Sequence, residues 1–124
     1  MSKKKILLVD DEQDLVDTVK LKLEFEGYEV MACYEGQDCL DKVGKIKPDI
    51  ILLDVMMPRL NGYEVCRKLK EDPQTQHIPV IMLTAKVQKL DQELGAKSGA
   101  NAYITKPFEF EDLLETLKKY LNCL

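Results

Sequence analysis

The sequence lacks most of the patterns that mark common cofactor and metal sites. It has no G-x-G-x-x-G segment and no G-x-x-x-x-G-K-[ST] loop, which counts against a nucleotide- or flavin-binding module. None of its four cysteines forms a C-x-x-C pair, so zinc-ligand spacing is absent. Without a secretory signal to suggest an oxidising compartment, we expect reduced thiols.

Basic charge and long apolar runs are also scarce. The net charge is −4 and the sequence pI about 5.1, so no basic field favours nucleic acid. The apolar run that follows the lysines at 3–5 covers only residues 6–9, too short for a signal peptide or a membrane span. We therefore expect a cytoplasmic protein that binds neither a membrane nor nucleic acid directly.

What is present is typical of one globular domain over residues 1–124. Hydrophobic residues make up 45% of the chain and charged residues 32%, which allows a packed core. Short apolar runs predict strands at residues 6–9, 50–53, 80–83 and 102–104, and a more alternating segment, nearer an edge, at 28–32. Apolar runs without alternation indicate strands covered on both faces, as in a parallel sheet.

Helical patterns separate these strands. One stripe predicts a helix that begins near Glu12 and ends at Gly27, and another predicts a last helix over residues 110–121. Two shorter apolar stripes, at residues 39–43 and 65–69, predict two further helices. Residues 88–98 have few apolar anchors and are expected to form the least firmly packed helix. Five strands alternating with five helices predict an α/β fold with right-handed crossovers and a doubly wound parallel sheet.

Ligands of such sheets bind beyond the carboxyl ends of the strands. Here the first predicted strand is followed by three acids, Asp10, Asp11 and Glu12. The strand at 50–53 is followed by Asp54, the strand at 80–83 by Thr84, and the strand at 102–104 leads to Lys106. Like charges about 4 Å apart repel by roughly 4 kcal/mol per pair at an effective dielectric near 20, so the acids need a proton, the amine or a cation. Mg²⁺ suits such oxygen ligands. Mg²⁺ together with a carboxylate nucleophile, a lysine and a hydroxyl is typical of sites that transfer phosphoryl groups.

Each of these residues has a simpler interpretation. The acids after the first strand could cap and solvate a helix, with Asp11 as the capping residue. Thr84 could cap the next helix, Lys106 could be a surface ammonium, and Tyr103 could be an ordinary, partly buried strand residue. The coincidence of complementary groups at four strand ends favours a site over these separate explanations.

Four segments, in chain order, resemble the motifs of response-regulator receiver domains. They are LLVDDE at residues 7–12, DVMMPRLNG at 54–62, LTA at 83–85 and KPF at 106–108. The similarity spans essentially the whole chain. It implies a flavodoxin-like sheet with strand order 2-1-3-4-5 and a phosphorylation switch in two-component signalling rather than a metabolic enzyme.

The resemblance also implies roles for the residues of the acidic site. Asp54 corresponds to the phosphoacceptor and Asp11 to the direct Mg²⁺ ligand, while Asp10 supports the metal and its waters. Met56 is expected to offer its backbone carbonyl to the metal. Lys106 corresponds to the ionic partner of the phosphate, and its bond to Pro107 is expected to be cis.

Two further residues correspond to the moving parts of the switch. Thr84 matches the hydroxyl that moves to bond the phosphate, and Tyr103 matches the aromatic that changes rotamer on activation. The expected signalling surface comprises residues 88–98, the last strand and the last helix. Because Met56 offers no amide or carboxylate to orient water, and Lys86 could shield the phosphate, we expect a long-lived phosphoryl group.

The implied donor is a sensor histidine kinase or a histidine phosphotransfer protein, and the signal passes to a downstream protein or output domain. A phosphorylation-dependent dimer is compatible with this scheme. Catalysis would be limited to the protein's own phosphorylation and dephosphorylation. The enzymatic alternative, a Mg²⁺-dependent phosphohydrolase of the haloacid-dehalogenase type, expects an Asp-x-Asp motif after the first strand, whereas Asp10 and Asp11 are adjacent.

Overall fold

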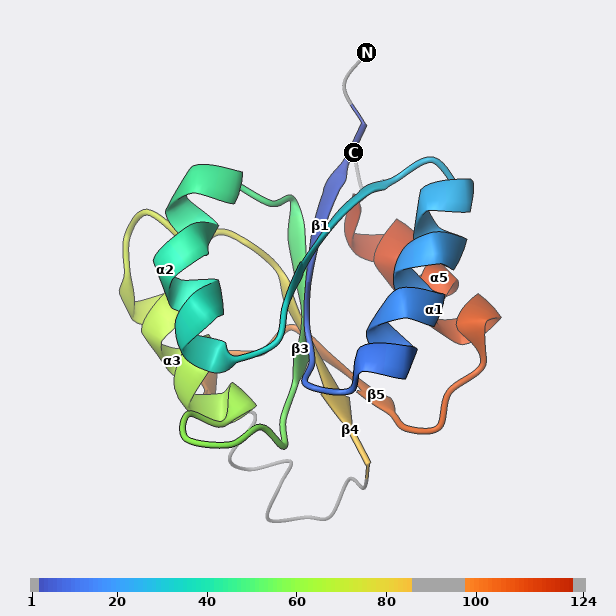
Figure 1. Cartoon of the computed structure of the whole chain (residues 1–124). Coiled ribbons are helices and arrows are strands. Elements are labelled where there is room, and N and C mark those ends of the chain that lie inside the picture. The colour runs from blue at the N-terminus through green and yellow to red at the C-terminus, as the bar shows by residue number, and fades with distance from the viewer. Residues whose placement is uncertain (1–2, 86–97, 122–124) are drawn as a thin grey trace.

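The computed structural model describes residues 3–85 and 98–121, which form a five-stranded parallel sheet between two layers of helices (Figure 1). The strands are β1 (Lys5–Val9), β2 (Glu29–Cys33), β3 (Ile50–Asp54), β4 (Val80–Thr84) and β5 (Ala102–Thr105). Their spatial order is β2-β1-β3-β4-β5, and every neighbouring pair is parallel. This confirms the order implied by the family resemblance and the expected edge position of β2.

Residues 3–85 and 98–121 contain four helices rather than the five predicted. They are α1 (Gln13–Phe25), α2 (Gly36–Ile46), α3 (Gly62–Glu71) and α5 (Phe110–Leu121). Figure 1 shows α1 and α5 on one face of the sheet and α2 and α3 on the other. Of the helix expected over residues 88–98, only Ser98 is among the described residues. Lys86 also lies outside them.

Alternate residues of the central strands divide between two cores. Ile6 and Leu8 pack with apolar residues of α1 and α5, whereas Leu7 and Val9 pack with those of α2 and α3. All four side chains are fully buried. Helices on both faces therefore explain why the strands are apolar without alternation.

The start of α1 differs from one interpretation of the sequence. The N-cap position is Glu12, and no side chain caps the helix, so the assignment of Asp11 as the capping residue is wrong. Instead, the Glu12 backbone N–H donates to Asp10 Oδ1 at 2.9 Å. This bond holds the acidic turn beside the end of β1. At the other end of the helix, Gly27 has a φ of 100°, the left-handed conformation expected of a terminating glycine.

Among the described residues, the cysteines Cys33, Cys39 and Cys66 are free and buried. Burial raises the pKa of Cys33 to about 11 and that of Cys39 to about 12, so both remain thiols at neutral pH. In the part of the chain that the structure describes, no helix is long and apolar enough to cross a membrane.

Candidate functional site

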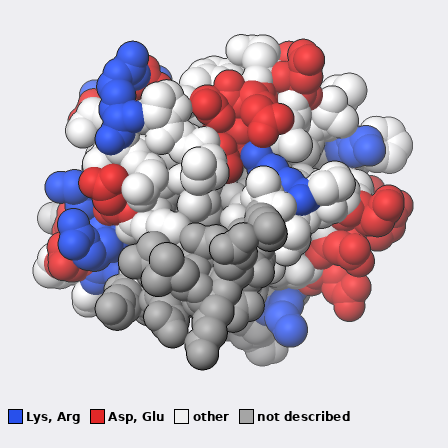
Figure 2. All heavy atoms as spheres, turned by 90° about the horizontal axis from the view of Figure 1, so that it is seen from below, with Lys and Arg blue, Asp and Glu red and all other residues white. Residues whose placement is uncertain are grey.

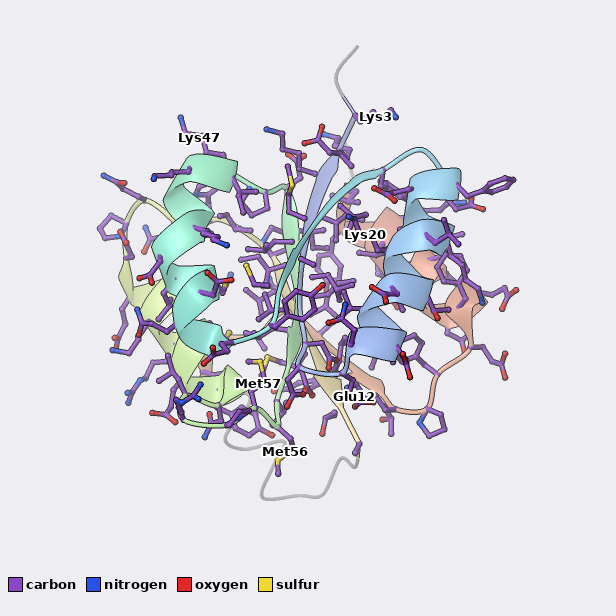
Figure 3. The ribbon with its side chains drawn as sticks, in the orientation of Figure 1. Lys3, Glu12, Lys20, Lys47, Met56 and Met57 are labelled. Carbon is purple, nitrogen blue, oxygen red and sulfur yellow. The ribbon has the colours of Figure 1, made fainter. Side chains whose placement is uncertain are left out.

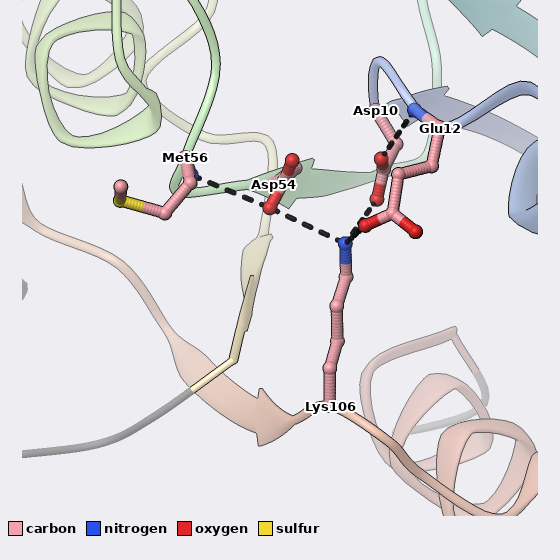
Figure 4. A network of polar contacts seen from close by, with 5 residues as sticks. All are labelled: Asp10, Glu12, Asp54, Met56 and Lys106. Atoms are coloured by element: carbon pink, nitrogen blue, oxygen red, sulfur yellow. Dashed lines mark hydrogen bonds and ion pairs between the residues drawn. The ribbon is translucent and has the colours of Figure 1, made fainter.

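The site lies where β1, β3 and β5 end. Asp10 follows β1, Asp54 is the last residue of β3, and Lys106 follows β5. The Lys106 backbone N–H donates to the carbonyl oxygen of Thr84 at 2.7 Å, which ties the chain after β5 to the end of β4. Because β4 separates β3 from β5, the long Lys106 side chain crosses it to reach the acids (Figure 4).

Lys106 is the centre of an ionic network. Its Nζ lies 2.7 Å from Asp10 Oδ2, 3.1 Å from Glu12 Oε1 and 3.4 Å from Asp54 Oδ1. The Asp10 side chain is fully buried, and that of Lys106 is only 11% exposed. Buried charges of this kind are tolerated because they are paired. The interpretation of Lys106 as a surface ammonium is therefore wrong.

The electrostatics of the site leave its carboxylates in need of positive charge. Burial and, second, the neighbouring Asp10 charge raise the pKa of Asp54 to about 6, although Lys106 and the Met56 backbone N–H act in the opposite direction. Burial disfavours the charged form of Lys106, but hydrogen bonding to Asp10 and the nearby carboxylates outweigh it, so its pKa is raised. Lys106 therefore stays protonated without fully compensating the acids.

Three carboxylates have a spacing that fits a metal ion. One oxygen each from Asp10, Asp11 and Asp54 lie within 4.8 Å of one another. A cation with oxygen ligands at about 2.1 Å spans oxygens up to about 4.2 Å apart, so small side-chain rotations suffice to bring all three onto one ion. Asp11 is exposed, which opens the group to solvent. The donor set fits Mg²⁺.

The loop after β3 completes the site. The Met56 backbone N–H donates to Asp54 Oδ1 at 3.3 Å, whereas the Met56 side chain points away from the carboxylate and is 72% exposed (Figure 4). Figure 3 places Met56 and Glu12 at the same end of the molecule, opposite Lys3 and Lys47. The loop returns to α3 at Gly62, whose backbone N–H donates to the Val55 carbonyl at 2.9 Å.

Gly62 is required by the close approach of α3 to the end of β3. A Cβ at this position would lie 2.3 Å from the Asp54 carbonyl oxygen and 2.9 Å from the Val55 Cα. Backbone atoms cannot yield as the tip of a side chain can, so a larger residue would displace Asp54. The neighbouring Asn61 and Glu64 form a capping box, which begins α3 at this point.

The residues matched to the moving parts lie beside this network. Thr84 is the last residue of β4 and is buried, in register with Thr105 of β5. Tyr103 is half-buried in β5, and its buried hydroxyl has no hydrogen-bond partner among the described residues. The Lys106–Pro107 bond is cis, as the family resemblance implied.

The ion pair between Glu12 and Lys106 was not predicted from the sequence. The sequence places Glu12 directly after two adjacent aspartates and so at the same strand end, but it carries no signal for the partner of this carboxylate. Only the path of the chain after β5 shows which carboxylates the ammonium contacts.

This architecture defines a class of protein: a flavodoxin-like α/β domain whose acidic site lies at the carboxyl edge of the sheet. Residues 6–118 match the response regulator receiver domain family, and the chain belongs to this family. Receiver domains are signalling domains of two-component systems.

Solved structures support the assignment over nearly the whole chain. A chemotaxis protein of Vibrio cholerae, CheY4, is 33% identical with a TM-score of 0.92, and the match covers 97% of this chain and 100% of that one. A putative response regulator from Chloroflexus aurantiacus is 33% identical with a TM-score of 0.91, covering 98% and 99%. The receiver domain of a sensor histidine kinase from Pseudomonas aeruginosa, 28% identical with a TM-score of 0.90 and covering 98% and 99%, has a magnesium ion coordinated in its active site cleft.

Proposed function

We propose that this chain is a phosphorylation-activated switch that accepts a phosphoryl group on Asp54 and thereby changes its contacts with a partner or output domain. The observation that carries the proposal is the Lys106 ammonium held between Asp10 and Asp54 at the edge where three aspartates converge. Family membership and the magnesium-bound relative support it. The donor in this proposal is a sensor histidine kinase or a histidine phosphotransfer protein.

Asp54 is the nucleophile of the proposed reaction. One of its carboxylate oxygens forms a bond to phosphorus while the bond from phosphorus to the donor imidazole nitrogen breaks, and the electron pair of that bond stays on the imidazole. Since only the ionised carboxylate is nucleophilic, a pKa near 6 leaves Asp54 active at neutral pH. Lys106 lies 3.4 Å from Asp54 Oδ1 and can pair with the incoming phosphate oxygens.

Asp11, Asp54 and the Met56 backbone carbonyl are the proposed ligands of Mg²⁺, and Asp10 supports the metal and its waters. When bound, the ion neutralises charge on the carboxylates and on the phosphoryl oxygens. Without it, an incoming dianion meets three aspartates whose only close cation is Lys106 among the described residues. Phosphorylation should therefore depend on the divalent ion.

The proposed switch links the phosphate to Tyr103 through Thr84. The Thr84 hydroxyl moves toward the phosphate, and the space it leaves allows Tyr103 to turn inward. A buried Tyr103 hydroxyl without a partner among the described residues supports this step, because no such bond need break when the ring moves. The proposed signalling surface includes β5 and α5; the remainder, residues 88–98, lies outside the described residues apart from Ser98.

We also propose that residues 1–124 act as a single receiver domain in the cytoplasm, with no catalysis beyond self-phosphorylation and self-dephosphorylation. A phosphorylation-dependent dimer would be one form of its output. The sheet and both helical layers share the two continuous cores described above, which supports a single unit.

The test is phosphorylation by acetyl phosphate, followed by intact-mass measurement. Wild-type protein should gain one phosphoryl group with Mg²⁺ and little in EDTA, and Asp54→Ala should gain none. Asp41→Ala, which removes an exposed acid of α2, is the matched control and should behave as wild type. Full modification of Asp54→Ala, or undiminished modification in EDTA, would refute the assignment.

A further inference from the structure

The side chain of Met56 is exposed in a loop that is otherwise firmly packed. It is 72% exposed, whereas its neighbours Val55 and Met57 are buried. The Val55 backbone N–H donates to the Leu83 carbonyl at 3.0 Å, and the Val55 carbonyl accepts from the Gly62 N–H at 2.9 Å. The loop therefore holds the Met56 backbone in place and leaves its thioether in solvent, where the side chain contributes little to the core.

Among the described residues, Met56 is the methionine most open to an oxidant. Met57 and Met82 belong to the core beside α2 and α3, and Met31 on β2 is 38% exposed. Oxidation of a buried methionine puts a polar group into the core and disrupts its packing. Oxidation of Met56 places the new polar group in water, so the fold should tolerate it.

The exposed thioether belongs to a residue that contacts the proposed phosphoacceptor. The Met56 backbone N–H donates to Asp54 Oδ1 at 3.3 Å, and Lys106 Nζ lies 3.4 Å from the same oxygen. Figure 3 places Met56 at the lower end of the molecule, and Figure 2, which views that end from below, shows acidic side chains gathered there beside uncharged surface. The acidic charge repels an anionic oxidant but not an uncharged peroxide.

We propose that Met56 is a site of reversible oxidation to methionine sulfoxide, and that the sulfoxide shortens the lifetime of the phosphoryl group on Asp54. The oxidant is hydrogen peroxide. A lone pair of the thioether sulfur attacks one peroxide oxygen, so that a sulfur–oxygen bond forms while the oxygen–oxygen bond breaks. The hydroxide that leaves takes up the proton carried by the transferred oxygen and becomes water. The sulfur is thus oxidised by two electrons and the peroxide is reduced.

The chemical change at Met56 accounts for the effect on the phosphoryl group. A thioether is a weak hydrogen-bond acceptor, whereas the sulfoxide is polar and its oxygen accepts strongly. The side chain is unbranched and flexible, and it starts from a backbone that already contacts Asp54, so its oxygen can accept a hydrogen bond from a water that attacks phosphorus. The inference rests on the proposed function, because it requires a phosphoryl group on Asp54, and adds an oxidative signal to it.

The first measurement locates the oxidation. Unphosphorylated protein is treated with a limiting amount of hydrogen peroxide, digested and analysed by mass spectrometry. Met56 should gain oxygen before Met31, Met57 and Met82, and the protein should keep the melting temperature of untreated protein. The two epimer-specific methionine sulfoxide reductases should remove the oxygen. Oxidation of any of the other three methionines ahead of Met56 would overturn the inference.

The second measurement follows the decay of radiolabelled phosphoprotein with and without peroxide treatment. Wild-type protein should lose its phosphoryl group about two- to tenfold faster after treatment, the scale of one added hydrogen bond in a transition state. The reductases should restore the original decay. Phosphorylated Met56→Leu should decay at the same rate with and without peroxide, which also excludes an effect through a cysteine. Met31→Leu is the matched control and should respond to peroxide as wild type does.

These outcomes separate the inference from the proposed function. If untreated wild type gained no phosphoryl group from acetyl phosphate, the proposed function would fail, and the inference with it. If untreated protein were phosphorylated but oxidised Met56 left the decay unchanged or slower, only the oxidative signal would be overturned. A response of Met56→Leu to peroxide equal to that of wild type would overturn it as well.

Discussion

The Lys106 ammonium lies 2.7 Å from the Asp10 carboxylate, although the two residues are separated by 96 positions in the chain. This contact joins the first strand end to the last. It also places one positive charge between two buried acids, Asp10 and Asp54. Removing the Lys106 charge should therefore affect both carboxylates. The consequences can be measured without knowing the partner.

Replacing Lys106 by alanine should destabilise the metal-free protein and strengthen Mg²⁺ binding. Loss of the ammonium leaves Asp10 and Asp54 without their shared partner, at a cost of about 2 kcal/mol or more in the free energy of unfolding. The same change removes a cation that competes with the metal, so Mg²⁺ affinity should rise by about tenfold. Chemical denaturation in EDTA and calorimetric Mg²⁺ titration would measure the two effects.

The matched control is Lys42→Ala. Lys42 pairs with Asp38 four residues earlier on α2, and both side chains are exposed, so its loss should lower the stability far less than the loss of Lys106. Phosphorylated Lys106→Ala should also bind a phosphorylation-dependent partner more weakly than phosphorylated wild type. Equal partner binding would show that Lys106 does not transmit the modification.

Asp54→Asn should stabilise the metal-free protein near neutral pH but not in acid. The pKa of Asp54 is raised from 3.8 to about 6 by burial and by the Asp10 charge, so the folded state holds this proton more tightly than the unfolded state. Stability from this group is therefore present below pH 4 and is lost as the pH rises to about 6. Allowing for partial solvent screening, the ionised carboxylate costs about 1–2 kcal/mol at pH 7.

Thermal unfolding of both proteins in EDTA, from pH 3.5 to 7.5, would check this. The melting temperature of Asp54→Asn should exceed that of wild type increasingly between pH 4 and 6, and Mg²⁺ should reduce or reverse the difference at pH 7. A difference that is constant with pH would contradict the proposed cost of ionising Asp54.

The fold could be predicted well where local pattern and burial coincide. The apolar stripe over residues 110–121 correctly predicts α5. One face of that helix packs on the sheet, so its apolar residues recur in the sequence with the period of a helix. The strand order is implied by the family resemblance alone. Each crossover could place the next strand on either side of the strand before it, and the hydrophobic period of a strand does not depend on which side is taken. The helix over residues 88–98 stays a prediction.

The site could be predicted as a set of strand ends but not as a set of contacts. The carboxyl ends of parallel strands meet at one edge, and this brings Asp10, Asp54 and Lys106 together. The contacts of the Lys106 ammonium depend on how far its side chain extends across β4, and the sequence does not give this. For the same reason, the pairing with Glu12 and the uncapped start of α1 emerge only from the three-dimensional structure.

Met56→Asn should shorten the lifetime of the phosphoryl group severalfold. The Met56 backbone N–H contacts Asp54 at 3.3 Å while the Met56 side chain is exposed, so an amide at this position can hydrogen-bond to a water that approaches the phosphoryl group. A thioether is a weak acceptor and donates nothing, whereas an amide can both accept from and donate to water. Decay of radiolabelled phosphoprotein would measure the effect. Met31→Asn, on β2, is the control, and an unchanged decay in Met56→Asn would contradict the argument.

Gly62→Ala and Gly44→Ala should change stability in opposite directions. At Gly62 a Cβ would lie 2.3 Å from the Asp54 carbonyl oxygen, so α3 or the end of β3 must shift, at a cost of about 1–3 kcal/mol. At Gly44, inside α2, nothing lies within 4 Å of the added Cβ, and alanine should gain about 0.5–1 kcal/mol.

The two variants also separate stability from function. Gly62→Ala should slow phosphorylation by acetyl phosphate even at a temperature where it remains folded, because the required shift moves the backbone that carries Asp54. Gly44 lies near the end of α2 that is followed by Lys47, opposite the site in Figure 3, so Gly44→Ala should be phosphorylated at the wild-type rate. Denaturant titration gives the stabilities and intact-mass time courses give the rates. If Gly62→Ala proved as stable and as readily phosphorylated as wild type, the close contact between α3 and the end of β3 could not be what positions Asp54.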